Sequence, residues 1–219
     1  MENVEIKNKK RIMKNTIMLY IRMIVIMAVS LYISRIVLNV LGESDFGIYN
    51  VVGSVVISLV FIQNTLASAT QRFLSYEIGK GDEGKIKQVY SMSINIQVIF
   101  MLIILILLET IGLWFVNRVL NIPENRMFAA NVVYQLSIAT FCINLLRIPY
   151  HSVIISFEKM NIYAVLSIVE AILKLFTAFL LLVINTDELI AYAIIVFVVT
   201  LIVNILYIIY CKRNICCIG

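Results

Sequence analysis

The sequence predicts an all-α membrane protein, with six transmembrane helices packed in one antiparallel bundle. Hydrophobic residues make up 62% of the 219 residues and charged residues only 14%, whereas a soluble domain is about 45–50% apolar and about 25% charged. Apolar stretches of about 20 residues, the length that spans a bilayer, recur along the chain and are separated by short polar breaks. The net charge of +5 is therefore interpreted through membrane topology and not as a nucleic-acid-binding surface.

The chain is expected to form one lobe with short extensions. Residues 1–15 are a basic cytoplasmic arm, 16–210 the six-helix lobe and 211–219 a short cytoplasmic tail. The arm is not a signal peptide, because the apolar run behind it is too long and no small-residue cleavage site follows. Cys142 falls within a span and the other cysteines lie near the C-terminal end, a pattern that favours free thiols over a disulfide framework.

The six predicted helices follow one another across breaks rich in turn residues. They cover residues 16–41, 47–75, 86–116, 128–150, 162–184 and 188–210. The breaks read GESDFG (42–47), GKGDEGK (79–85), NIPENR (121–126), SFEKMN (156–161) and NTDE (185–188). Because every break is short, neighbouring helices are expected to pack as antiparallel hairpins.

The distribution of basic residues predicts the orientation of the bundle. One side carries Lys7, Lys9, Lys10, Arg11, Lys14, Lys80, Lys85, Lys87, Lys159, Lys212 and Arg213. The other side offers Arg118 and Arg126 against Glu43, Asp45, Glu124, Asp187 and Glu188. The positive-inside rule then places both termini in the cytoplasm, with six crossings.

Polar side chains recur with helical spacing inside several of these segments. The second segment carries Asn50, Ser54, Ser58, Asn64, Thr65, Ser68, Arg72 and Ser75, and the third carries Ser91 and Asn95. The fourth carries Ser137, Thr140, Asn144, Arg147 and His151, and the fifth Tyr163, Ser167, Glu170, Lys174 and Thr177. Serine and threonine alone would favour close helix packing, but Asn, Arg, Glu and Lys on the same faces favour a hydrated cavity.

Three arginines are predicted to surround the cytoplasmic mouth of that cavity. Arg22 lies in the inner part of the first helix, Arg72 and Arg147 lie near the inner ends of the second and fourth, and Lys174 is deeper. The alternative is snorkelling, in which long basic side chains near helix ends reach the membrane interface.

Arg35 is expected to serve the fold. It lies 13 residues beyond Arg22, roughly 140° around a straight helix, so the two side chains do not easily line one cavity. Its position near the outer turn predicts a structural ion pair with the acidic residues there, above all Asp45.

Glu170 and Lys174 stand four residues apart with the acid first, which is the favourable order for a helical ion pair. Mutual neutralisation is one interpretation. The other is that Glu170 is a carboxylate that couples transport to a proton or an ion.

The residues do not form a catalytic pattern. His151 has no serine or cysteine partner at a recognisable spacing, and the chain shows no Gly-rich phosphate loop and no cluster of metal ligands. His151, next to Pro149, is interpreted as an interfacial residue at a helix end. We expect neither enzymatic activity nor a cofactor or metal.

Two stretches resemble a known family. SRIVLNVLGESDFGIYNVVGSVV (34–56) resembles the first hairpin of the polysaccharide flippases in the multidrug/oligosaccharidyl-lipid/polysaccharide exporter superfamily, where an arginine precedes a Leu-Gly turn, an acidic residue and a Gly-Ile-Tyr helix start. ATQRFLSYEIGKGD (69–82) is similar to the end of that family's second helix. Elsewhere the resemblance extends only to hydropathy.

The resemblance implies a multi-pass transporter of the bacterial cytoplasmic (inner) membrane. It would move lipid-linked oligosaccharide (a polyprenyl-pyrophosphate sugar) from the inner to the outer leaflet for polysaccharide or lipopolysaccharide biosynthesis. By this analogy Arg22 and Arg72 engage the pyrophosphate head group and Arg147 assists. The residues assigned to the substrate cavity are Arg22, Arg72, Arg147, Lys174, Asn64 and Asn95. The expected partners are this substrate and membrane lipids. We expect no nucleic-acid partner.

Family members have twelve or more spans in two lobes, and the six here match the N-terminal lobe. We therefore expect a second lobe or a second chain as partner, since a lone lobe would expose its polar faces to lipid. The alternatives are a cation-coupled exporter of small molecules from the same superfamily, which would favour buried carboxylates over arginines, and an inactive membrane module that serves only assembly.

Overall fold

The computed structural model describes residues 2–183 and 187–214, with the side chains of 13, 16–183 and 187–213. The described residues are almost entirely helical and include no β-strand, which confirms the predicted all-α class. The helices are α1 (Glu2–Ile57), α2 (Val60–Lys80), α3 (Glu83–Leu107), α4 (Leu113–Arg118), α5 (Met127–Ser156), α6 (Met160–Leu181) and α7 (Glu188–Asn214), with a π-helical segment η1 (Leu108–Gly112) and a 3-10 turn η2 (Glu124–Arg126). The basic side chains of the predicted arm, residues 184–186 at the predicted break before 188–210, and the tail beyond residue 214 with Cys216 and Cys217 lie outside the described residues.

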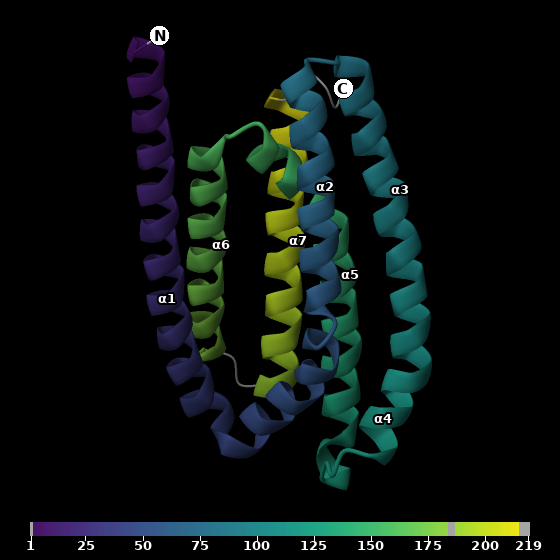
Figure 1. Cartoon of the computed structure of the whole chain (residues 1–219). Helices are drawn as coiled ribbons and strands as arrows, with labels where there is room; N and C mark the ends of the chain where they lie inside the picture. The colour runs from purple at the N-terminus through teal and green to yellow at the C-terminus, as the bar shows by residue number, and fades with distance from the viewer. Residues whose placement is uncertain (1, 184–186, 215–219) are drawn as a thin grey trace.

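The predicted break at 42–47 is a sharp kink within α1. Gly42 has φ 73° and ψ 171°, a backbone conformation that costs a residue with a Cβ and is readily adopted by glycine. The chain turns back here and runs on through the second part of α1 toward α2 (Figure 1). The long first limb of α1 therefore forms one helix of the bundle, and residues 43–57 begin the next.

A second break, between α1 and α2, was not predicted. It falls at Ser58 and Leu59, inside the segment expected to be one helix over 47–75. The Ser54 and Ser58 hydroxyls each donate to the carbonyl three residues earlier, both at 2.7 Å. Such side-chain bonds compete with the helical ladder and bend helices, and this effect is not visible in hydrophobic periodicity.

The break at 79–85 follows ordinary capping chemistry. Gly81 ends α2 in the left-handed conformation (φ 73°), and its N–H donates to the carbonyls of Glu77 and Ile78. The Asp82 carboxylate then accepts a hydrogen bond from the Lys85 N–H at 3.1 Å, which caps α3 and holds the pKa of Asp82 below its usual value. The turn residues thus specify this connection locally.

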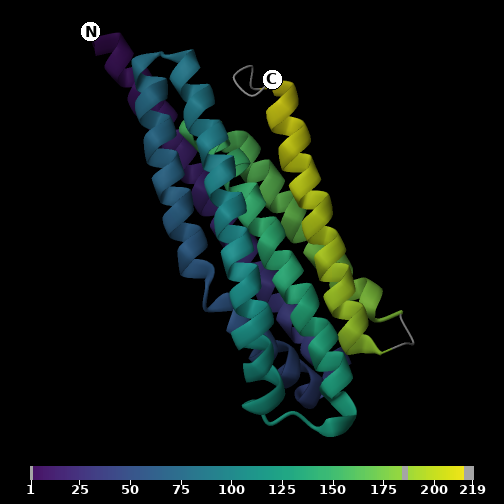
Figure 2. The same ribbon diagram turned by 90° about the vertical axis from the view of Figure 1, so that its right-hand side faces the viewer.

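Helix α5 lies at the centre of the bundle. It packs against α1, α2, α3, α6 and α7, whereas α1 packs mainly on α6. Figure 2 shows α2, α3, α5 and α7 succeeding one another across the molecule. The start of α1 and the end of α7 lie at the same end of the molecule (Figure 1).

Five helices in the described part of the chain are long and apolar enough to cross a membrane. They cover Thr16–Ile57, Glu83–Arg118, Glu124–Ser156, Met160–Leu181 and Glu188–Arg213. Helix α2 is not one of them, because Asn64, Arg72 and several hydroxyl residues interrupt its apolar character. The composition therefore supports a multi-pass membrane protein.

The π-helical segment η1 packs against α5 through one buried tyrosine. The Tyr134 side chain is fully buried, and its hydroxyl donates to the Leu108 carbonyl at 2.8 Å. A Cβ built on Gly112 would overlap the same hydroxyl. Glycine at 112 is thus what lets Tyr134 reach the Leu108 carbonyl in the wider turn.

Gly112→Ala is expected to lower the stability of the detergent-purified protein by about 1–3 kcal/mol, the usual cost of overpacking a core. Gly79→Ala is the matched control, because a Cβ at Gly79 meets nothing within 4 Å; it should be neutral or slightly stabilising, since alanine favours a helix. Thermal midpoints from size-exclusion chromatography of heated samples measure both. Equal midpoints for the two variants would contradict this account of η1.

The predicted ion pair between Arg35 and Asp45 is wrong. Asp45 is buried and pairs with Arg126 at 2.8 Å, and Arg126 also pairs with Asp187 at 2.8 Å. Arg35 is an exposed residue of α1, ahead of the Gly42 kink. One arginine from η2 therefore ties together the turn in α1, the start of α5 and the residue before α7, a contact between distant segments that local sequence does not reveal.

Arg126→Ala is expected to lower the free energy of unfolding by about 1–3 kcal/mol, since it leaves the buried Asp45 carboxylate unpaired. Asp45→Asn should cost more than Asp187→Asn, because the Asp45 side chain is 9% exposed and that of Asp187 is 36% exposed. Arg35→Ala should leave the thermal midpoint unchanged. A loss with Arg35→Ala and none with Arg126→Ala would reverse the assignment.

Candidate functional site

A cavity of about 670 Å³ lies between α1, α5, α6 and α7. Its lining includes Arg22 of α1, Arg147 and His151 of α5, and Glu170 and Lys174 of α6. We call it the charged cavity. All members of the polar face predicted over 162–184 line this space: Tyr163, Ser167, Glu170, Lys174 and Thr177.

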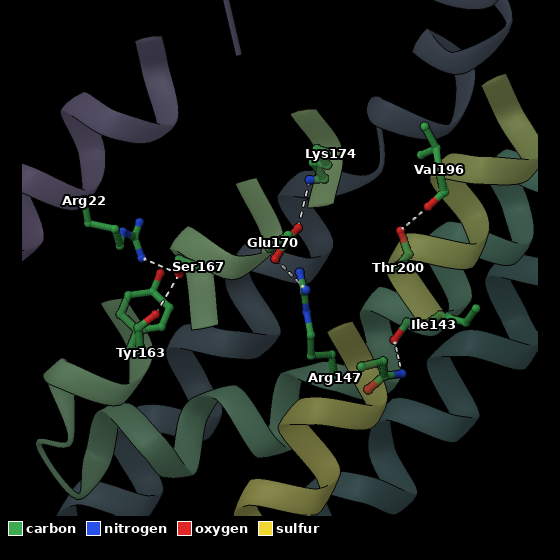
Figure 3. A network of polar contacts seen from close by, with 10 residues as sticks. Arg22, Ile143, Arg147, Tyr163, Ser167, Glu170, Lys174, Val196 and Thr200 are labelled. Carbon is green, nitrogen blue, oxygen red and sulfur yellow. Dashed lines mark hydrogen bonds and ion pairs between the residues drawn. The ribbon is translucent and has the colours of Figure 1, made fainter. Parts of the chain in front are cut away.

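Arg22 reaches from α1 toward α6 (Figure 3). Its Nη1 donates to the Ser167 hydroxyl at 3.4 Å, and its guanidinium carbon lies 4.2 Å from the centre of the Tyr163 ring. Its Nε is buried and has no hydrogen-bond partner among the described residues. Because a buried, unpaired donor is costly, a hydrogen-bond acceptor at this atom would be stabilising.

Glu170 forms ion pairs with the two other cationic residues of the cavity, Arg147 and Lys174 (Figure 3). Its Oε2 accepts from Arg147 Nη1 at 3.0 Å and its Oε1 from Lys174 Nζ at 2.8 Å. Three cationic side chains and one carboxylate leave the lining with a net charge of +2, counting His151 as neutral. A site of this charge favours anions.

Aromatic side chains complete the charged cavity. The His151 ring lies 4.8 Å from the ring of Tyr163 and 6.3 Å from that of Tyr207, both measured between centroids. Arg147 lies 5.4 Å from the Tyr207 ring centre. His151 therefore lines the cavity, and α5 continues beyond it to Ser156, so His151 does not lie at the helix end where it was expected. Its place one turn beyond Arg147 is the sequence signal that puts both on one face.

Sequence reasoning missed the tyrosines of α7. Tyr192 and Tyr207 line the charged cavity, and Tyr192 packs against Tyr49 of α1 with 4.9 Å between ring centroids. In an apolar helix such as α7, tyrosine is also enriched at the membrane–water interface. The pattern alone therefore gave no reason to assign these residues to a cavity.

A second cavity, of about 190 Å³, lies beside the first. Tyr49, Ile57 and Val196 line both. Its polar lining is Asn50, Gln63, Ser137, Thr140 and Asn144, and none of the described residues that line it is charged. We call it the neutral cavity. The polar face predicted along 128–150 thus faces two spaces: its first part lines the neutral cavity, and Arg147 and His151 line the charged one.

The other predicted site residues are not brought to either cavity. Arg72 and Asn64 are exposed on α2, and Asn95 is exposed on α3. The whole polar face predicted over 47–75 is exposed: Asn50, Ser54, Ser58, Asn64, Thr65, Ser68, Arg72 and Ser75. We call this surface the polar stripe. Of its members, Asn50 alone also lines a cavity.

No group of three or more His, Cys, Asp or Glu side chains in the described residues is placed to hold a metal ion. Comparison of the chain with protein-family models, with curated proteins and with solved structures gave no match. The chemistry of the cavity lining is therefore the basis for assigning a function to this site.

Proposed function

We propose that the chain is one lobe of a flippase that moves lipid-linked oligosaccharide from the inner to the outer leaflet of a bacterial cytoplasmic membrane. The charged cavity carries the proposal: its lining has a net charge of +2 inside an apolar helical bundle, and one of its cations, Arg22, has a buried, unpaired Nε. A charge at membrane depth is costly and marks a functional pathway more often than a packing contact.

A pyrophosphate is the head group that suits this cavity best. The planar guanidinium of Arg22 can donate paired hydrogen bonds to phosphate oxygens, and Arg147 and Lys174 lie on the facing helices. The alternative, a cation-coupled exporter of small molecules, would instead favour buried carboxylates over arginines. Glu170, the acidic residue of the described lining, is already paired with two cations.

The exposure of the polar stripe is the observation that supports a partner for this lobe. Its members are exposed on α1 and α2, and they include Arg72 and three asparagine or threonine residues. Lipid offers such groups no hydrogen bonds. We therefore propose that a second lobe, or a second chain, faces the stripe across a water-filled passage.

The proposed topology has six crossings and both termini in the cytoplasm. In this proposed topology the second part of α1 and α2 together form one crossing, and the turn at Gly42 and the loop before α5 lie outside. With the native cysteines removed, cysteines at Ser44 and Asn125 should react with a membrane-impermeant thiol reagent in whole cells, and a cysteine at Gly81 should not. All three residues are exposed. Labelling at Gly81 without labelling at Ser44 would invert the topology.

Binding of inorganic pyrophosphate to the purified chain in lipid nanodiscs tests the proposal. We expect pyrophosphate to bind more tightly than phosphate, with affinity that falls as salt rises. Arg22→Lys should weaken binding by about tenfold or more. Arg35→Lys is the matched control and should bind normally, because Arg35 lines neither cavity. Binding that is absent, or that does not depend on Arg22, would refute a head-group site in the charged cavity.

A further inference from the structure

The neutral cavity offers hydrogen-bond acceptors. Ser137 and Thr140 each donate their hydroxyl proton to a backbone carbonyl of α5, both at 2.8 Å. Asn50 Nδ2 donates to the Phe46 carbonyl at 2.8 Å, and Gln63 Nε2 to the Phe141 carbonyl at 3.3 Å. The oxygens of all four side chains therefore keep lone pairs for an outside donor.

Asn144 adds both kinds of group. Among the described residues it has no hydrogen-bond partner, and it is half-buried between the polar members of the cavity. Its amide can donate and its oxygen can accept. Acceptor oxygens together with one free amide, and no charge, match the hydroxyl groups of a neutral sugar.

The size and the apolar lining of the neutral cavity also fit a sugar ring. A volume of about 190 Å³ corresponds to about six water molecules at roughly 30 Å³ each, the scale of one pyranose ring. The buried Phe141 and the Tyr49 ring line the same space. Aromatic rings with a few placed polar groups are the usual composition of a small-molecule site, and the C–H faces of a pyranose can pack on such rings.

The order of the two cavities matches the order of groups in the proposed substrate. In a polyprenyl-pyrophosphate sugar, the first sugar is bonded directly to the second phosphate. The neutral cavity directly adjoins the charged one, since Tyr49, Ile57 and Val196 line both. We infer that the neutral cavity binds an uncharged sugar unit of the substrate while the charged cavity holds its pyrophosphate. This inference rests on the proposed function.

Saturation-transfer NMR with a panel of neutral methyl glycosides on the full chain in nanodiscs tests the inference. At least one glycoside should receive saturation from the unaltered protein. Asn144→Leu and Thr140→Val should each weaken that binding by about tenfold, the loss expected for one hydrogen bond. Thr110→Val is the matched control: the Thr110 hydroxyl also donates to backbone carbonyls, but the residue is exposed on η1 and lines neither cavity.

Pyrophosphate binding separates the two proposals. Asn144→Leu should lose the glycoside and keep pyrophosphate, whereas Arg22→Lys should lose pyrophosphate and keep the glycoside. Pyrophosphate binding without any glycoside binding would overturn the sugar site and leave the proposed function standing. Sodium binding in the neutral cavity would also overturn the sugar site, because the same oxygens would then be cation ligands. It would appear as stabilisation of the protein by sodium that choline does not reproduce and that Thr140→Val abolishes.

Discussion

Arg22→Lys is expected to insert and fold normally yet lose most export of lipid-linked sugar by the proposed flippase. Lysine keeps the positive charge and can still lie over Tyr163, which the Arg22 guanidinium approaches at 4.2 Å. It lacks the buried Nε and the planar arrangement of donors that a pyrophosphate requires. A loss of about tenfold or more corresponds to roughly 1.4 kcal/mol of binding.

The measurement is complementation of surface polysaccharide in cells that lack the chromosomal copy, beside a membrane immunoblot for protein level. Arg35→Lys and Arg35→Ala are the controls, and both should support normal level and export, because Asp45 pairs with Arg126 and not with Arg35. Full polysaccharide with Arg22→Lys would remove the head-group role from Arg22.

Glu170→Gln is expected to reduce the amount of protein in the membrane several-fold. Glu170 neutralises part of the charge of Arg147 and Lys174, and the side chains of Glu170 and Arg147 are each 22% exposed. Removing one partner of a buried ion pair costs about 3–5 kcal/mol, and the partial exposure here places the expected loss toward the lower end.

A second substitution tests whether neutralisation is the whole role of Glu170. Charge exchange between 170 and 174 would place a lysine against Arg147, so we prefer Glu170→Gln with Lys174→Gln, which restores the net charge of the lining to +2. Protein level should recover, and export per molecule should equal that of Lys174→Gln alone. Recovered level with export well below that of Lys174→Gln would assign Glu170 to coupling.

The all-α membrane class and most of the breaks between helices can be predicted from the amino-acid sequence. An apolar composition with recurring long runs requires helices, because a backbone in lipid must satisfy its own hydrogen bonds. The breaks at Gly42, at Gly81 with Asp82, and around Pro123 follow from local backbone preferences that act within a few residues. Periodicity also identified which polar residues share a helix face, as on α6.

What each of those polar faces contacts depends on how the helices pack. The stripe on α6 faces the charged cavity, whereas the equally periodic stripe on α1 and α2 is exposed, with Arg72 on its surface. Asp45 pairs with Arg126, which lies far along the chain. Spacing along one helix fixes directions relative to that helix alone, and the neighbours in each direction depend on how all the helices pack.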